Sequence, residues 1–250
     1  MTILVQFVLR LALGMSAAMA ITPPRQVTSG FYRNQLYVLL GLDVLAAILC
    51  WSLPEPLFWI AAVGAVLCYA GAVCWLYEMP RAGIAALVLV SLSALAGLWW
   101  PLVSAGISSQ PARALTWLAP LSGGAVLGVT MAAMLLGHWY LNSPTMQLTP
   151  LRRLVALMAL VLLIRMVLCG ASLGLLVAEV GSPSVDRWLF LSLRWAAGLL
   201  GPLGLTWMTW QTLKIPNTQS ATGILYVAVI GTFVGELTSQ LLSTTSPYPL

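Results

Sequence analysis

Apolar residues in this chain form long runs that are separated by short polar breaks. A helix needs about 20 consecutive apolar residues to cross a bilayer core of about 30 Å. Eight runs reach that length, at roughly 2–20, 35–52, 57–77, 82–104, 115–141, 151–178, 187–212 and 219–243. A transmembrane β-barrel would alternate polar and apolar residues instead. The pattern predicts an all-α polytopic integral membrane protein, with one membrane domain over residues 1–250.

The breaks between the runs carry turn residues. Most contain proline, as in Thr22-Pro23-Pro24-Arg25, Leu53-Pro54-Glu55-Pro56, Met79-Pro80-Arg81, Asn142-Ser143-Pro144, Gly181-Ser182-Pro183 and Ile215-Pro216-Asn217. The break at 104–113 is the least apolar stretch in the middle of the chain, so we expect it to join two four-helix bundles. The first run lacks a basic leader and contains Arg10, which favours a membrane helix over a cleaved signal peptide.

Composition excludes several classes of protein. Apolar residues make up 60% of the chain and charged residues only 7%, against about 25% charged in soluble domains. A soluble enzyme, a disordered chain and a disulfide-stapled secreted module are therefore excluded. The net charge of +5 comes from bases scattered singly between apolar runs, which is typical of membrane topology signals and not of nucleic-acid binding.

The distribution of bases predicts an orientation in the membrane. Six bases fall on the odd-numbered connections: Arg25, Arg33, Arg81, Arg152, Arg153 and Lys214. The opposite side has only Arg113 and Arg187. Because basic loops stay in the cytoplasm, we expect both termini on the non-cytoplasmic side of the cell (inner) membrane.

Five charged residues lie inside the predicted spans: Arg10, Asp43, Arg165, Arg194 and Glu236. Each costs about 2.5–3.5 kcal/mol near the centre of a helix, so each needs a partner or a role. Equal depth predicts an ion pair between Arg194 and Glu236, and a long side chain would let Arg10 reach Asp43. Arg165 has no acid at its depth. For all of these charges a structural role and a ligand or proton role both stay open.

The only histidine, His138, lies beside two aromatic residues near the cytoplasmic end of the fifth run. An interfacial histidine beside Trp and Tyr is more often a member of the aromatic belt than a ligand, and both roles stay open for His138. One histidine cannot provide the pair that ligates a membrane b-type haem, and the dispersed acids lack metal-ligand spacing. The sequence therefore predicts no metal-ligand cluster and no self-contained catalytic motif, while a haem with mixed ligands stays open.

Glycine spacing predicts where helices pack closely. Small residues four apart share one helix face and let two backbones approach. Three such pairs occur: Gly124/Gly128, Gly170/Gly174 and Gly231/Gly235. In the seventh run, glycines on both sides of Pro202 predict a locally weak, kinked helix.

Two late segments carry a resemblance to a known family. They are Leu193-Arg194-Trp195-Ala196-Ala197-Gly198 with Gly201-Pro202-Leu203, and Gly235-Glu236-Leu237. With eight helices and short loops, the chain resembles the membrane anchor subunits of molybdenum-type oxidoreductases, the DMSO-reductase anchor and polysulfide-reductase-type (NrfD-like) families. The specific match covers roughly residues 190–240.

This resemblance implies an integral subunit of a larger redox complex, with iron–sulfur or cytochrome subunits as partners and quinone as the electron carrier. A quinone headgroup needs a hydrogen-bond donor and a proton acceptor. The candidates are His138, Arg165, Asp43 and Arg10, while Arg194 and Glu236 are matched positions. Two other hypotheses stay open: a small secondary transporter or channel that uses the same charges, and a purely structural scaffold subunit.

Overall fold

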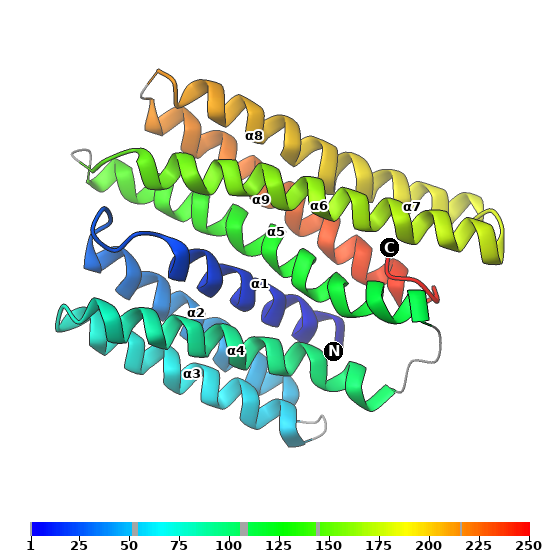
Figure 1. Ribbon diagram of the computed structural model, residues 1–250, viewed down its shortest axis with the longest axis horizontal. Coiled ribbons are helices and arrows are strands. Elements are labelled where there is room, and N and C mark those ends of the chain that lie inside the picture. Colours follow the sequence, from blue (N-terminus) through cyan, green and yellow to red (C-terminus); the bar gives the residue numbers. More distant parts are fainter. Residues whose placement is uncertain (1, 52–54, 106–109, 144–145, 216) are drawn as a thin grey trace.

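The computed structural model describes residues 2–51, 55–105, 110–143, 146–215 and 217–250 of the chain (Figure 1). All secondary-structure elements in these residues are helices. Eight helical stretches of the described residues are long and apolar enough to cross a membrane. The predicted fold class, an all-α polytopic membrane protein with eight spans, is confirmed.

The described residues form nine α-helices and one short π-helix, joined by turns. In chain order they are α1 (Thr2–Ile21), α2 (Ser29–Cys50), α3 (Glu55–Leu76), α4 (Pro80–Ala105), α5 (Gln110–Asn142), α6 (Thr149–Val180), α7 (Val185–Trp195), η1 (Ala196–Leu200), α8 (Gly201–Thr212) and α9 (Thr218–Ser243). Helix α2 begins at Ser29, ahead of the apolar run that starts at 35. The extra turn forms because Phe31 and Tyr32 are buried against the protein, so packing extends the helix beyond its lipid-facing part.

Parts of the predicted breaks lie outside the described residues. These parts are 52–54, 106–109, 144–145 and 216. The remaining turns fall where proline predicts them: α1 ends at Ile21, just before Pro23, and α4 begins at Pro80.

The spans pack as two groups of helices that meet along one seam (Figure 1). Helices α2, α3 and α4 pack side by side and α1 lies against α4, while α5 contacts α6 and α9 in the second group. The seam between the groups is formed mainly by α1 and α5, the two spans with the largest buried share. Figure 1 shows the start of α1 and the end of the chain at the same end of the molecule.

Glycines allow the close approach of α1 and α5. A Cβ atom added at Gly14 would overlap the carbonyl oxygen of Gly124, and one added at Gly128 would overlap the backbone of Gly14. The prediction for the Gly124/Gly128 pair is therefore confirmed. It is wrong for Gly170/Gly174, because a Cβ at Gly174 would have no neighbour within 4 Å.

The seventh span stays helical through its glycine- and proline-rich centre. Its three pieces α7, η1 and α8 follow one another without a break. The N–H of Gly201 bonds to the carbonyl of Ala196, a π-type bond five residues back. Pro202 cannot donate a hydrogen bond, so the extra residue is accommodated immediately before it. The predicted weak point is thus a single π-helical turn.

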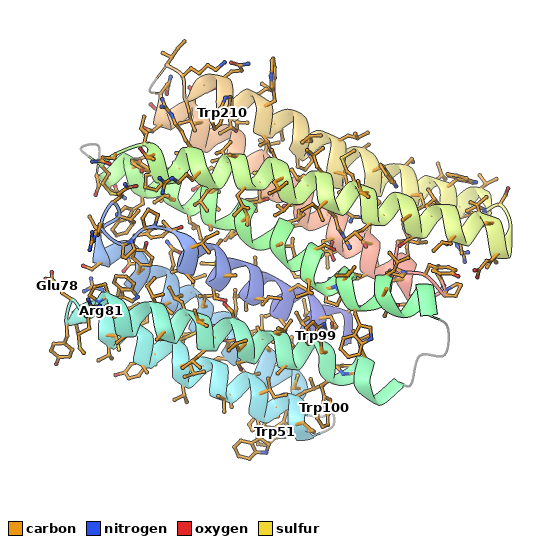
Figure 2. The ribbon with its side chains drawn as sticks, in the orientation of Figure 1. Trp51, Glu78, Arg81, Trp99, Trp100 and Trp210 are labelled. Carbon is orange, nitrogen blue, oxygen red and sulfur yellow. The ribbon has the colours of Figure 1, made fainter. Side chains whose placement is uncertain are left out.

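Tryptophans lie at both ends of the bundle, and Trp51, Trp100 and Trp210 are exposed. Figure 2 shows Trp51, Trp99 and Trp100 at one end and Trp210 at the other. Trp51 and Trp100 are 78% and 43% exposed. Amphipathic rings favour the boundary between headgroups and hydrocarbon, so these positions fit two membrane interfaces. Which end faces the cytoplasm stays a prediction from the loop bases.

Candidate functional site: a buried arginine–glutamate cluster

Four of the five charges in the spans meet at one place, around the carboxylate of Glu236 on α9. Arg10 of α1 binds Oε1 of Glu236 through Nη1. Arg165 of α6 and Arg194 of α7 approach Oε2 at 3.2 Å and 3.7 Å. The side chains of Arg165, Arg194 and Glu236 are 3% exposed or less. We call these four residues the cluster.

Arg165 is held on several sides. Its Nη1 donates to Ser122 Oγ at 3.0 Å and its Nη2 to Ser239 Oγ at 3.1 Å. A further bond, 3.3 Å long, reaches the carbonyl of Ala119. Because α5 and α9 both provide partners, the guanidinium carried by α6 is held in a fixed position.

Glycines provide the space in which the cluster lies. A Cβ at Gly123 of α5 would overlap the carboxylate of Glu236. A Cβ at Gly198 of η1 would come within 2.9 Å of Arg194 Nη1 and 2.5 Å of the Cα of Gly235. The close contact of η1 with α9 therefore brings Arg194 to Glu236 and leaves no room for another side chain.

The cluster carries more positive than negative charge. Three guanidiniums surround one carboxylate, and in the described residues no second acidic side chain lies within ion-pair distance of them. The Nε atoms of Arg10, Arg165 and Arg194 also lack hydrogen-bond partners. Uncompensated charge in a low-dielectric interior is expensive. The arrangement therefore favours an additional anionic or strongly polar oxygen.

A small pocket reaches the cluster from the end of the bundle where α1 begins and α9 ends. It has a volume of about 210 Å³ and is lined by Ile3, Gln6, Arg10, Gln240, Ser243 and Thr244. Gln240 is 6% exposed, and neither its amide nitrogen nor its amide oxygen has a partner. Unsatisfied buried polar groups are uncommon. An arginine and an unpaired amide thus face the same space.

The structure has one of the two pairings predicted from depth, replaces the other, and gives Arg165 a partner. Arg194 and Glu236 lie 3.7 Å apart, as equal depth predicts. Arg10 contacts Glu236 and not Asp43, because α1 packs on α5 and α9 at this level. Arg165, for which depth offered no acid, shares the same carboxylate. One acid thus pairs with three bases, which equal depth on two helices does not predict.

His138 lies apart from the cluster. Its Nδ1 is 3.3 Å from the hydroxyl of Tyr226, on an exposed part of α5 and α9. At a rise of about 1.5 Å per residue, it is about 24 Å along α5 from Ser122. The structure therefore does not bring it together with Arg10 and Arg165.

Asp43 forms a separate polar site between α2 and α3. It is 2% exposed and accepts a hydrogen bond of 3.3 Å from the thiol of Cys68. A Cβ at Gly64 would lie 2.9 Å from its Oδ2. No cation of the described residues lies within ion-pair distance of Asp43.

We expect Asp43→Asn to change stability by less than about 1 kcal/mol. The amide is isosteric with the carboxyl, its oxygen still accepts from Cys68, and no ion pair is broken. Thermal unfolding of the detergent-solubilised protein measures this effect, with Gly41→Ala as a control because a Cβ there has no neighbour within 4 Å. A loss of several kcal/mol would reveal a cation partner for Asp43 and contradict the prediction.

Sequence reasoning missed the polar residues around the charges. Ser239 and Gln240 follow Glu236 by three and four positions, and Cys169 follows Arg165 by four. Residues at these spacings share a helix face. Cys169 does lie beside the cluster, with its Sγ 3.4 Å from Arg194 Nη2. A search for polar residues one turn from each buried charge would have found them.

Comparisons of the chain with protein-family models, with curated proteins and with solved structures find no match. In the part of the chain that the structure describes, no group of three or more His, Cys, Asp or Glu side chains could hold a metal ion. The cluster is thus the main concentration of buried charge from which a function can be argued.

Proposed function

We propose that this chain is an integral membrane subunit of a quinone-linked redox complex, and that the cluster with its pocket binds the quinone headgroup. The observation that carries the proposal is the excess of two positive charges in a buried site beside a polar pocket. Such a site attracts an oxygen that is negatively charged or strongly polarised.

The residues present fit a headgroup. The guanidinium of Arg10 and the amide of Gln240 border the pocket and can donate to a carbonyl oxygen. Glu236 lies directly behind Arg10, and its carboxylate holds that guanidinium in place at the pocket. A quinone, when bound, would supply the two-electron, two-proton chemistry of the complex. The pocket volume of about 210 Å³ suits a single ring or small anion, since drug-sized ligands need roughly 300–1,000 Å³.

The residues that carry the family resemblance also support the redox proposal. Arg194 and Glu236 contact the same site, and Gly198 packs on Gly235 between them. These positions are about 40 residues apart in the sequence, so their meeting is a property of the fold. The proposal assigns headgroup contacts to Arg10 and Gln240 and gives no such role to His138 or Asp43.

We expect Arg10→Gln to lower the quinone that co-purifies with the protein by about tenfold, the effect of losing one charge-assisted hydrogen bond of about 1.5 kcal/mol. The change leaves Arg165 and Arg194 to pair with Glu236, so the fold persists. The measurement is quinone content per protein in lipid extracts of the gently solubilised complex.

Arg153→Gln provides the control, because Arg153 is an exposed base outside the pocket. Equal quinone content in both variants, or no quinone and no redox subunits in the wild-type complex, would overturn the proposal. Unchanged turnover per assembled complex in Arg10→Gln would favour the scaffold hypothesis.

A second candidate function is transport of a small anion. The observation that favours it is the size of the pocket together with the π-helical turn beside Arg194, because π-turns are frequent at functional sites. Uptake of labelled carboxylates or phosphate by proteoliposomes that contain only this chain would support the carrier. Its absence, together with co-purified iron–sulfur or cytochrome subunits, would support the redox subunit.

A further inference from the structure

The two ends of the bundle differ strongly in charge. The end with the α1–α2 and α3–α4 connections carries six bases and one acid, Glu78. The other end carries two bases and three acids. The basic end therefore presents an attractive surface to anionic membrane components.

A groove of about 870 Å³ lies at this basic end. It is lined by Pro24 and Arg25 of the α1–α2 connection, by Met79, and by Pro80, Arg81, Ala82 and Ile84 of α4. Figure 2 shows Arg81 and Glu78 here, at the end opposite to Trp51 and Trp100. Two arginines from segments more than fifty positions apart in the sequence thus face one space.

Neither arginine has an acidic partner. In the described residues, Arg25 and Arg81 form no ion pair, and Glu78 does not approach them within ion-pair distance. By contrast, Arg152 at the same end donates to the carbonyl of Leu213 at 2.6 Å. The two guanidiniums of the groove are therefore free to bind an anion bidentately.

We propose that this groove binds the phosphate of an anionic phospholipid, with Arg25 and Arg81 as its ligands. The groove lies at the end of membrane spans, where lipid headgroups are found. Its lining combines the two charges with Met79 and Ile84, and Met79 is 54% exposed. A free phosphate makes no use of apolar walls, whereas a lipid buries the upper part of its acyl chains against them.

Native mass spectrometry of the protein released from nanodiscs tests this site. The probe is phosphatidylglycerol, compared with phosphatidylcholine of the same chain length. The double variant Arg25→Gln/Arg81→Gln is expected to retain at least tenfold less phosphatidylglycerol, with phosphatidylcholine unchanged. Arg33→Gln/Arg153→Gln is the matched control, because it removes the same charge from the same end outside the groove.

Three outcomes would overturn the proposal. Equal losses in the two double variants would mean a general basic surface instead of a site. Displacement of the lipid by millimolar inorganic phosphate would indicate a free-anion site. Retention that depends on an acidic protein partner would indicate a docking surface. Size-exclusion profiles of both double variants establish that the fold is intact, and Arg25→Lys/Arg81→Lys should restore part of the retention because the charges remain.

Discussion

Glu236→Gln should destabilise the protein by about 3–5 kcal/mol, the usual cost of leaving a buried charge without its partner. Three ion pairs are lost in one substitution, because the carboxylate of Glu236 is the acidic partner of Arg10, Arg165 and Arg194. Since folded proteins are stable by only about 5–15 kcal/mol, we expect a sharp drop in the amount of folded protein in the membrane. Thermal unfolding in detergent and membrane yield measure the effect.

The control is Asp186→Asn, which removes an exposed acid from the first turn of α7. If its effect equals that of Glu236→Gln, the cluster does not stabilise the fold. Adding Arg194→Met to Glu236→Gln should recover part of the loss, because one uncompensated cation is then replaced by an apolar side chain of similar length.

Gly128→Ala should also destabilise the protein, by a different mechanism. The new methyl group would overlap the backbone of Gly14 on α1, and no flexible side chain is present to move aside. Overpacking typically costs about 1–3 kcal/mol and occasionally more. The helices must therefore separate along the seam. Cross-linking of cysteines introduced on α1 and α5 would report the change, together with thermal unfolding.

Gly223→Ala is the matched control, because a Cβ there meets nothing within 4 Å and alanine is the better helix former. It should be neutral or slightly stabilising. If Gly128→Ala cross-links and unfolds like the wild type, the contact between Gly128 and the backbone of Gly14 is not as close as in the structure, and the prediction is wrong.

The spans were predictable from the sequence because the bilayer imposes their length and apolar character. Membership of the cluster was only partly predictable. Depth along a helix places Arg194 and Glu236 at the same level, but it contains no information on which helices are neighbours. The position of Arg10 depends on the α1–α5 crossing at Gly14, a contact between residues far apart in the sequence.

Glycine spacing was informative in the same limited way. The pairs at 124/128 and 231/235 lie at close helix contacts, whereas Gly174 faces open space. Spacing shows that a backbone could approach a helix face, and the presence of a partner depends on the tertiary arrangement. The π-turn at Ala196–Leu200 was predicted only as a weak point, because the choice between a kink and a π-bond depends on packing against Gly235.

One consequence follows from the origin of the four charges. Arg10 comes from the first group of helices and the other three members come from the second. The salt bridge between Arg10 and Glu236 therefore also links the two groups of helices across the seam. A ligand that competes with Glu236 for Arg10 must change how tightly those groups hold each other. By thermodynamic reciprocity, separation of the two groups changes the affinity for that ligand by the same factor by which the ligand changes the equilibrium between packed and separated groups.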